Sequence, residues 1–553
     1  LTRMYQPRYW FGDSIYYQDL GNIGTASQPL LFEFPKEIGV RLGKNVFDRY
    51  AYRPEEVMYF DTRSPYSHLI YNQGTLGQQY LEGKFTRNIK PWWNFGFAYQ
   101  GLGSNQQMGT GGFAQGLVQH KGLLAFMHLQ TPNQKYHLFA NYTHHNHDSR
   151  ETGGLRTTSD PYEVLDSLRQ VNVNLNNARN IETRNRFRLA QHYALVGDAI
   201  KLFHSLDLRR QTNRYIDNDI PYAADNILLF YPRTIYNPSQ TSDRSTFVTL
   251  DNKVGIAGNN KLLYYQAYLK RRDATIKYLS PNWNDYTQYF VGGETDFKWK
   301  EWVHVHGEGE FKFSDEYRIQ AKAKLRYLWA EQSRIKYSPT LVQQEVFNNH
   351  FVWSNNFVNS IADRTSVGFE ASFAKNLLKL EGSYVNLQNY IFFNQQAEPQ
   401  QLATQQKLYK AQLYHKVALG NLNLEHLGVY TNTDDAPFVR VPEWLINSKI
   451  YYQGFLFKKA MFGQIGFETT MSSDYYADAY MPATQQFYLQ NSFLVKSYPV
   501  IDFFIAADIK TVNVYLKLAH ANEGFPDKGY YVTPFYTGLQ RSVLFGVKWQ
   551  FFD

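Results

Sequence analysis

The sequence predicts an all-β protein, a single-chain transmembrane antiparallel β-barrel of about 18–22 strands with an N-terminal arm or plug segment. Two patterns predict this fold. Polar and apolar residues alternate along segments long enough to cross a bilayer, and short and long connections alternate between those segments. A barrel with an aqueous lumen requires both, because its strands face lipid on one side and water on the other, and its periplasmic turns are short.

The clearest alternation lies in two neighbouring segments, residues 302–311 and 317–329. In the first, every second position is charged or titratable: His304, His306, Glu308 and Glu310. In the second, every second position is polar or basic: Arg318, Gln320, Lys322, Lys324 and Arg326. A strand points residues i, i+2 and i+4 to one face, so each segment has one polar face and one apolar or small-residue face.

The same alternation recurs from about residue 66 to the end of the chain. Residues 184–195 set Arg184, Arg186 and Arg188 opposite an apolar face, and residues 261–272 do the same with Lys270 and Arg272. The segments are about 10 to 13 residues long, whereas strands of soluble sheets are usually ~5–6. This length favours a membrane barrel over a soluble β-sandwich or propeller, whose strands also alternate.

The composition fits a polar lumen bordered by aromatic girdles. Aromatic residues make up 17% of the chain, with 44 Tyr and 40 Phe, and the mean hydropathy is −0.49. No run approaches the ~18 apolar residues of a membrane helix. The chain has no cysteine, which excludes disulfides and thiolate chemistry. It begins at Leu1, so we take it as a processed or partial chain.

The order of the connections predicts which end of the barrel each faces. Short turns are expected at residues 88–91, 132–134, 197–198, 258–260, 300–301, 375–376, 420–421 and 458–459. Long polar connections are expected at 103–120, 148–181, 211–244, 274–286, 331–358, 393–404, 432–442, 472–485 and 523–540. Residues 1–60 lack sustained alternation and are expected to form an arm or a lumen plug, with the barrel over 61–553. A periplasmic arm that docks a partner is the rival interpretation.

The polar faces supply the candidate pore-lining residues. These are Arg184, Arg186, Arg188, Lys270, Arg272, His304, His306, Glu308, Glu310, Arg318, Gln320, Lys322, Lys324 and Arg326. A hairpin with both polar faces inward would pair Glu310 with Arg318 and His304 with Lys324, around a loop at 313–315. The net charge of +8 favours anions in an open pore, unless the charges pair with each other and with the arm.

Histidine clusters are the candidate metal ligands. His144, His145 and His147 precede a long connection, where solvated histidines are the simpler interpretation. His304 and His306 beside Glu308 and Glu310 are explained by a wet polar wall, so no metal or other cofactor is predicted. No nucleophile or phosphate-binding motif stands in a recognisable context, so an outer-membrane enzyme is the least favoured hypothesis.

Several ordered stretches resemble one family. Residues 59–66 read Tyr-Phe-Asp-Thr-Arg-Ser-Pro-Tyr, which is similar to the opening motif of a Bacteroidota family of outer-membrane proteins called putative porins. Residues 21–24, 349–357, 389–394 and 548–553 are similar to further parts of that family, in the same order along the chain. The resemblance implies a single-chain barrel in the outer membrane of a Gram-negative bacterium and brings no catalytic or ligand residues with it.

Two functions fit these observations. The first is passive diffusion of small hydrophilic solutes through a polar lumen. The second is a plugged barrel that acts as a subunit of a larger outer-membrane complex for protein export, barrel assembly or nutrient uptake. The expected partners are outer-membrane lipid and lipopolysaccharide, the barrel-assembly machinery during biogenesis, and further outer-membrane or periplasmic subunits. No concentrated basic patch points to nucleic acid.

Overall fold

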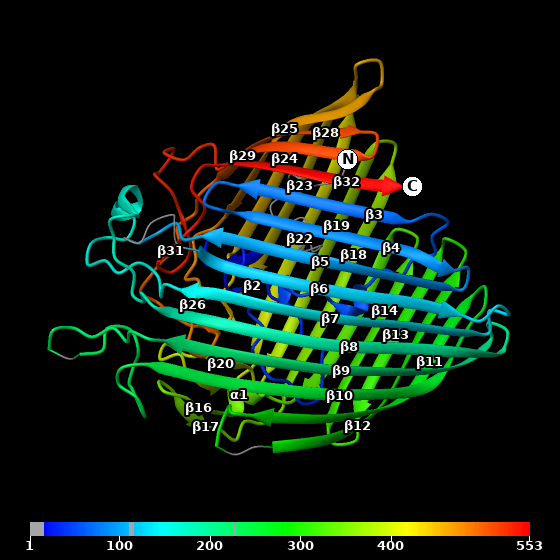
Figure 1. The fold of residues 1–553 in the computed structure, drawn as a ribbon, viewed down its shortest axis with the longest axis horizontal. Helices are drawn as coiled ribbons and strands as arrows, with labels where there is room; N and C mark the ends of the chain where they lie inside the picture. Colours follow the sequence, from blue (N-terminus) through cyan, green and yellow to red (C-terminus); the bar gives the residue numbers. More distant parts are fainter. Residues whose placement is uncertain (1–15, 110–115, 226, 282–283, 553) are drawn as a thin grey trace.

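A closed antiparallel barrel makes up most of the molecule (Figure 1). The structure is a computed structural model that describes residues 16–109, 116–225, 227–281 and 284–552. Within these residues, 22 strands follow one another around the barrel in chain order, and the last pairs with the first. In that closing pair Tyr66 lies opposite Phe552 and Gly74 opposite Leu544. The strand number is the upper end of the predicted range, and an even number lets the closing strands pair antiparallel.

The barrel strands are mostly longer than those of soluble sheets. They are β3 (Tyr66–Gly74), β4 (Gln79–Lys90), β5 (Trp93–Asn105), β6 (Gly116–Gln130), β7 (Tyr136–Glu151), β8 (Ala178–Val196), β9 (Ile200–Asp217), β10 (Thr241–Asn259), β11 (Leu263–Lys277), β12 (Asn284–Trp299), β13 (Val303–Lys312), β14 (Glu316–Leu325), β15 (Leu328–Tyr337), β18 (Ser360–Phe373), β19 (Asn376–Gln388), β22 (Gln406–Leu419), β23 (Leu422–Asn432), β24 (Trp444–Leu456), β25 (Met461–Ser472), β28 (Val500–Ile509), β29 (Val512–Ala519) and β32 (Ser542–Phe552).

Shorter elements belong to the connections and to the N-terminal segment. Five two-stranded hairpins lie outside the barrel sheet in the described residues: β1 (Tyr17–Asp19) with β2 (Ser27–Pro29), β16 (Glu345–Phe347) with β17 (Val352–Ser354), β20 (Ile391–Phe393) with β21 (Pro399–Gln401), β26 (Ala479–Met481) with β27 (Gln486–Tyr488), and β30 (Tyr531–Thr533) with β31 (Tyr536–Thr537). The helical turns are η2 (Asp48–Tyr50), η3 (Pro54–Glu56), η4 (Glu163–Ser167) and α1 (Leu341–Gln344). No helix in the described ranges is long and apolar enough to cross a membrane.

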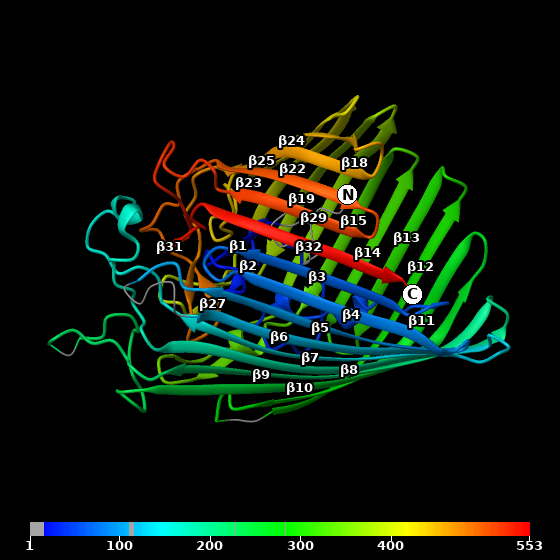
Figure 2. The ribbon, with the colours of Figure 1, turned by 45° about the horizontal axis from the view of Figure 1, so that its top comes forward.

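The connections separate into a short end and a long end (Figures 1 and 2). All eight predicted short turns lie at one end, together with two that the sequence analysis missed, at 326–327 and 510–511. The predicted long connections lie at the other end, although residues 110–115, 226 and 282–283 of three of them fall outside the described ranges. The short end therefore faces the periplasm and the long end the exterior.

The predicted hairpin of β13 and β14 is confirmed in register. Glu310 pairs with Arg318, Glu308 with Gln320, His306 with Lys322 and His304 with Lys324. The single strand predicted over 317–329 is wrong, because the chain turns at residues 326–327. Arg326 has a φ of 54° there, a left-handed conformation that ends the strand.

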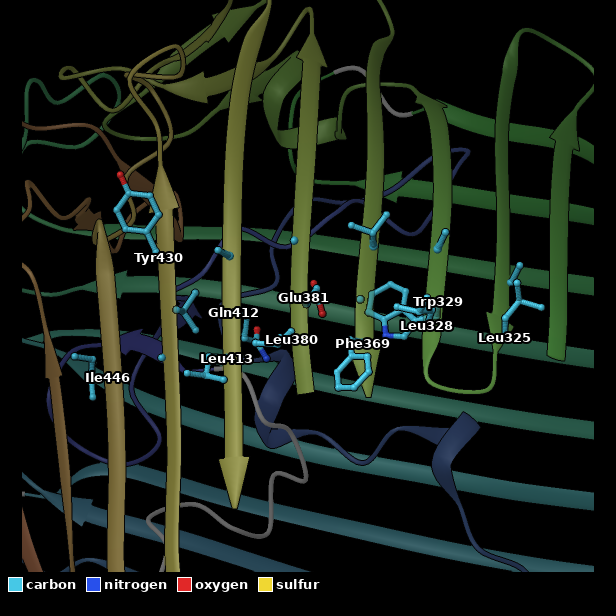
Figure 3. Close-up of a pocket in the computed structure, with 18 residues that line it drawn as sticks. Leu325, Leu328, Trp329, Phe369, Leu380, Glu381, Gln412, Leu413, Tyr430 and Ile446 are labelled. Carbon is cyan, nitrogen blue, oxygen red and sulfur yellow. The ribbon is translucent and has the colours of Figure 1, made fainter. Parts of the chain in front are cut away.

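The two faces of the wall differ as a membrane barrel requires. On β14 and its neighbours the apolar side chains, such as Leu325, Leu328 and Leu413, are exposed on the outer surface, where lipid would cover them. A hollow of about 880 Å³ on this surface runs across β14–β24 and is lined mostly by apolar and small residues. Figure 3 shows the residues that line it. Glu381 and Gln412 alternate with these residues and belong to the opposite face.

Because the chain has no cysteine, single cysteines can report which face each residue occupies. In outer-membrane vesicles, Gln320→Cys is expected to react with a charged, water-soluble maleimide, since it lies on the polar face of β14. Ala321→Cys, one residue along, is expected to remain unlabelled because it faces lipid. Labelling of both to the same extent would contradict the assignment of faces.

Candidate functional site

The described part of the N-terminal segment lies inside the barrel (Figure 2). Residues 16–60 contribute no strand to the barrel; residues 1–15 of the predicted arm lie outside the described ranges. Phe34 and Ile38 pack against the wall formed by β12–β23, in a cluster with Phe290. Tyr59 and Phe60 pack against β5 and β6, which lie on the other side of the strand order. We call residues 16–60 the plug, because they span the lumen from one wall to the other.

Ion pairs join the plug to the basic face of β8. Arg184 pairs with Asp48 of the plug, and Arg186 pairs with Glu55. Arg188 also lies near Glu55, with 3.7 Å between its guanidinium and the carboxylate. Arg186 also pairs with Asp207 on β9, so its guanidinium lies between two carboxylates. Three of the predicted pore-lining residues therefore lie on the lumen wall and face the plug.

Polar bonds also hold the plug at β12, at β14 and at the connection that contains α1. The backbone N–H of Gly39 donates to the Glu316 carboxylate at 2.7 Å, and that of Val40 donates to Gln288 at 3.0 Å. The backbone N–H groups of Leu341 and Val342 donate to plug carbonyls at 2.9 and 3.0 Å. Backbone bonds of this kind fix the path of the segment without depending on its side chains.

Close packing shows how tightly the plug is held. At Gly39, which has a φ of +83°, a β-carbon would lie 2.7 Å from the Gln288 side chain and 2.9 Å from the Phe290 ring. At Gly21, with a φ of +89°, a β-carbon would lie 2.0 Å from the carbonyl oxygen of Thr537, in an external loop. Only glycine fits both the backbone conformation and the space at these positions.

External loops cover the outer side of the plug. Leu20, Ile23 and Phe47 share a buried cluster with side chains from the connections 152–177, 473–499 and 520–541. The Gln18 amide donates to the carbonyl of Asp478 at 2.7 Å, and the Thr533 hydroxyl donates to the carbonyl of Asp19 at 2.7 Å. The hairpins β26–β27 and β30–β31 belong to these loops. Loops and plug together form one packed layer across the outer mouth.

The other predicted pore-lining charges pair with one another along the wall. Lys270 lies 2.6 Å from Glu310, Arg272 lies 2.6 Å from Asp251, and Arg318 lies 2.7 Å from Glu308. Lys322 and Lys324 lie 3.4 Å from Glu331 and Glu370, respectively. His304 and His306 both contact Asp296, at 3.0 and 3.3 Å. Gln320 lies opposite Glu308 on the same face.

Arg326 does not lie with these residues. Its guanidinium stacks over the rings of Trp302 and Tyr327, with 4.8 and 4.5 Å to their centroids, at the periplasmic rim. The inclusion of Arg326 among the pore-lining residues is therefore corrected: it is a turn residue, and the alternation of the second segment ends before it.

Burial changes the acid–base behaviour of plug and loop groups. Burial lowers the pKa of Lys44 to about 8, although Asp243 and Glu182 act in the opposite sense. Burial alone would raise the pKa of Glu55, but Arg186 outweighs it and holds that pKa below its usual value. Burial raises the pKa of Asp478 in the external loop to about 6, against the influence of Gln28 and Arg440. Glu55 is therefore charged at neutral pH, as its ion pair requires.

A buried histidine cluster lies on the lumen wall beside the plug, and the sequence predicted two of its residues to be solvated. His145 and His147 were expected to be solvated, but they are 4% and 0% exposed because β7 continues to Glu151. The Nδ1 atoms of His120 and His147 are 3.1 Å apart, and His145 contacts Glu182 at 3.2 Å. The Tyr50 ring of the plug stacks on His147. Polar residues at every second position of β7 were the signal that could have placed these histidines in the wall.

Metal binding finds no further support in the described ranges. No group of three or more His, Cys, Asp or Glu side chains there is arranged to hold a metal ion. The arrangement places a segment across the lumen and attaches it by ion pairs, hydrogen bonds and packing.

Solved structures of outer-membrane receptors and transporters share the fold. The FrpB iron transporter of Neisseria meningitidis (F5-1 variant) is 12% identical, with a TM-score of 0.63 over 89% of this chain and 83% of that one. The siderophore receptor PirA of Acinetobacter baumannii is 9% identical, with a TM-score of 0.63 over 89% and 81%. A point mutant of the ferric enterobactin receptor PfeA of Pseudomonas aeruginosa is 10% identical, with a TM-score of 0.65 over 89% and 81%.

At these identities the likeness concerns the fold alone. No curated protein matches the sequence. A family model described as "Putative porin" matches residues 1–553, the whole chain. Together with the closed barrel and its polar lumen, this match places the protein in the outer membrane, and the chain belongs to the putative porin family.

Proposed function

We propose that the protein is a plugged outer-membrane barrel that takes up small hydrophilic solutes when its plug is displaced. The observation that carries this proposal is the plug itself, which spans the lumen and is bonded to β8, to β14 and to the external loops. A pore for unassisted diffusion needs a lumen that stays open, so the plug favours regulated uptake over the passive channel. The proposal assigns the protein no catalytic role.

The known activities of structurally similar proteins are consistent with uptake. The three proteins compared above are named as an iron transporter, a siderophore receptor and a ferric enterobactin receptor. Their low identity means that the solute cannot be transferred to this chain. A plug held by several ion pairs and hydrogen bonds also requires an input of free energy to move, since an ordinary hydrogen bond contributes about 0.5–1.5 kcal/mol. A further periplasmic or outer-membrane subunit would supply that input, which keeps the role in a larger complex within this proposal.

Removal of the plug tests the proposal directly. The intact protein is expected to show little conductance in planar bilayers, and a variant lacking residues 1–60 is expected to show large, stable channels. The physical reason is that the plug is the segment that spans the lumen between the walls. Heat-modifiable electrophoretic mobility would show that the variant barrel is folded. Equal conductance of the two folded proteins would mean that the plug does not close the lumen.

A single plug contact can be weakened with a matched control. Glu55→Gln removes the carboxylate that pairs with Arg186, whereas Glu56→Gln changes a neighbour that pairs within the plug, with Arg53 at 3.2 Å. A half-exposed ion pair contributes about 0.5–1 kcal/mol, so Glu55→Gln should raise the open probability about two- to fivefold. Glu56→Gln should leave it unchanged. Single-channel recordings measure both, and an equal effect of the two substitutions would contradict the role of the Arg186 pair.

A further inference from the structure

A polar pocket lies between the plug and the wall formed by β4, β5 and β6. It has a volume of about 150 Å³ and is lined by plug residues 49–53 and 56–58 and by wall residues that include Glu82, Lys84 and Phe126. Arg53, Glu56 and Met58 are exposed at its edge, so it opens to the water of the lumen. The volume is enough for one small organic molecule.

Opposite charges stand side by side in the wall of this pocket. Glu82 and Lys84 occupy alternate positions of β4, and their charged groups are 3.8 Å apart, beyond hydrogen-bonding distance. Their side chains are only 13% and 15% exposed. The Tyr80 hydroxyl donates to one carboxylate oxygen of Glu82 at 2.8 Å and fixes its position. The Glu82 carboxylate is therefore held in position, but it is not hydrogen-bonded to the Lys84 ammonium group.

Three further charged residues belong to the lining, and each has a partner of its own. Arg53 and Glu56 pair with each other at the edge of the pocket, 3.2 Å apart, and the Arg49 guanidinium lies over the Tyr17 ring, 3.7 Å from its centroid.

The other lining residues are uncharged. Leu124 and Phe126 are 3% and 2% exposed and form an apolar floor. The Tyr52 hydroxyl is buried and has no hydrogen-bond partner among the described residues. A buried hydroxyl without a partner is unfavourable, so a ligand that supplies one would be stabilised there.

The charge pattern selects the class of ligand. A simple anion would be attracted by Lys84 and repelled by Glu82, and a simple cation would meet the reverse. A zwitterion satisfies both charges at once. In an α-amino acid the nitrogen and the carboxylate lie about 2.5–3.5 Å apart, which matches the spacing of the pair.

We propose that this pocket binds a small zwitterion such as an α-amino acid. The ammonium group contacts Glu82, the carboxylate contacts Lys84, and an apolar side chain lies on Leu124 and Phe126. The inference rests on the proposed function in one respect, which is that the ligand is a solute on its way through the barrel. Binding itself can be measured without transport.

Calorimetry on the purified full-length protein tests the ligand class. L-Leucine is compared with 4-methylpentanoate, which lacks the ammonium group, and with 3-methylbutylamine, which lacks the carboxylate. Leucine is expected to bind about 10- to 100-fold more tightly than either, since each loses one charge-assisted contact. Glucose is the neutral control. Absent leucine binding, or binding of either single-charge analogue as tightly as leucine, overturns the inference.

Variants locate the site. Glu82→Gln and Lys84→Met should each weaken leucine binding about 10-fold or more. The matched controls are Glu381→Gln and Lys410→Met, which change another ion pair of the wall, 3.0 Å apart and outside the pocket. Unaltered binding in both folded pocket variants, or equal losses in the controls, overturns the assignment.

The two proposals fail separately. Removal of residues 1–60 takes away one side of the pocket, so leucine binding should weaken while conductance rises. If conductance rises but the intact protein binds no leucine, only the pocket assignment fails. If leucine binds but conductance is unchanged by the deletion, only the plug proposal fails.

Discussion

The alternation of side chains along the barrel strands, which only a few register shifts interrupt among the described residues, is the constraint on which the rest of the structure depends. It directs apolar residues to lipid and collects charged residues on the inner wall, where Arg184, Lys270 and Glu308 all lie. Charges gathered on a partly enclosed surface need partners, because their solvation there is poorer than in bulk water. The wall provides many of these partners itself, and the plug provides others through Asp48 and Glu55. The same constraint that builds the barrel therefore creates the surface that holds the plug.

Local rules predicted the barrel well. The register of β13 and β14 could be predicted because the charged faces of both strands must point inward. A shift by one residue would have put the charges of one strand into lipid. The short turns followed from breaks in the alternation. The turn at Arg326 was missed because the polar pattern continues to the residue where the chain reverses, and nothing in the composition marks the left-handed conformation there.

Contacts between distant segments could not be read from the sequence. The pairing of Arg186 with Glu55 depends on where a segment without periodicity lies in three dimensions. The burial of His147 depends on the length of β7 and on Tyr50 lying against it. The position of the basic residues on the inner face was predictable, because side chains alternate between the two faces along a strand. Which of them would meet the plug, and which would pair within the wall, was not.

The external loops and the plug are interlocked. Thr533 bonds to the backbone of Asp19, Gln18 bonds to the backbone of Asp478, and Gly21 leaves no free space against Thr537. The plug consequently cannot move out of the lumen unless these contacts with the loops break. If the plug is displaced as proposed, thermodynamic reciprocity requires that whatever stabilises the loops in another arrangement also favours release of the plug, and that release of the plug alters the loops. Under that proposal, a signal would pass between the cell surface and the periplasmic side through residues 16–60, which contribute no strand to the barrel.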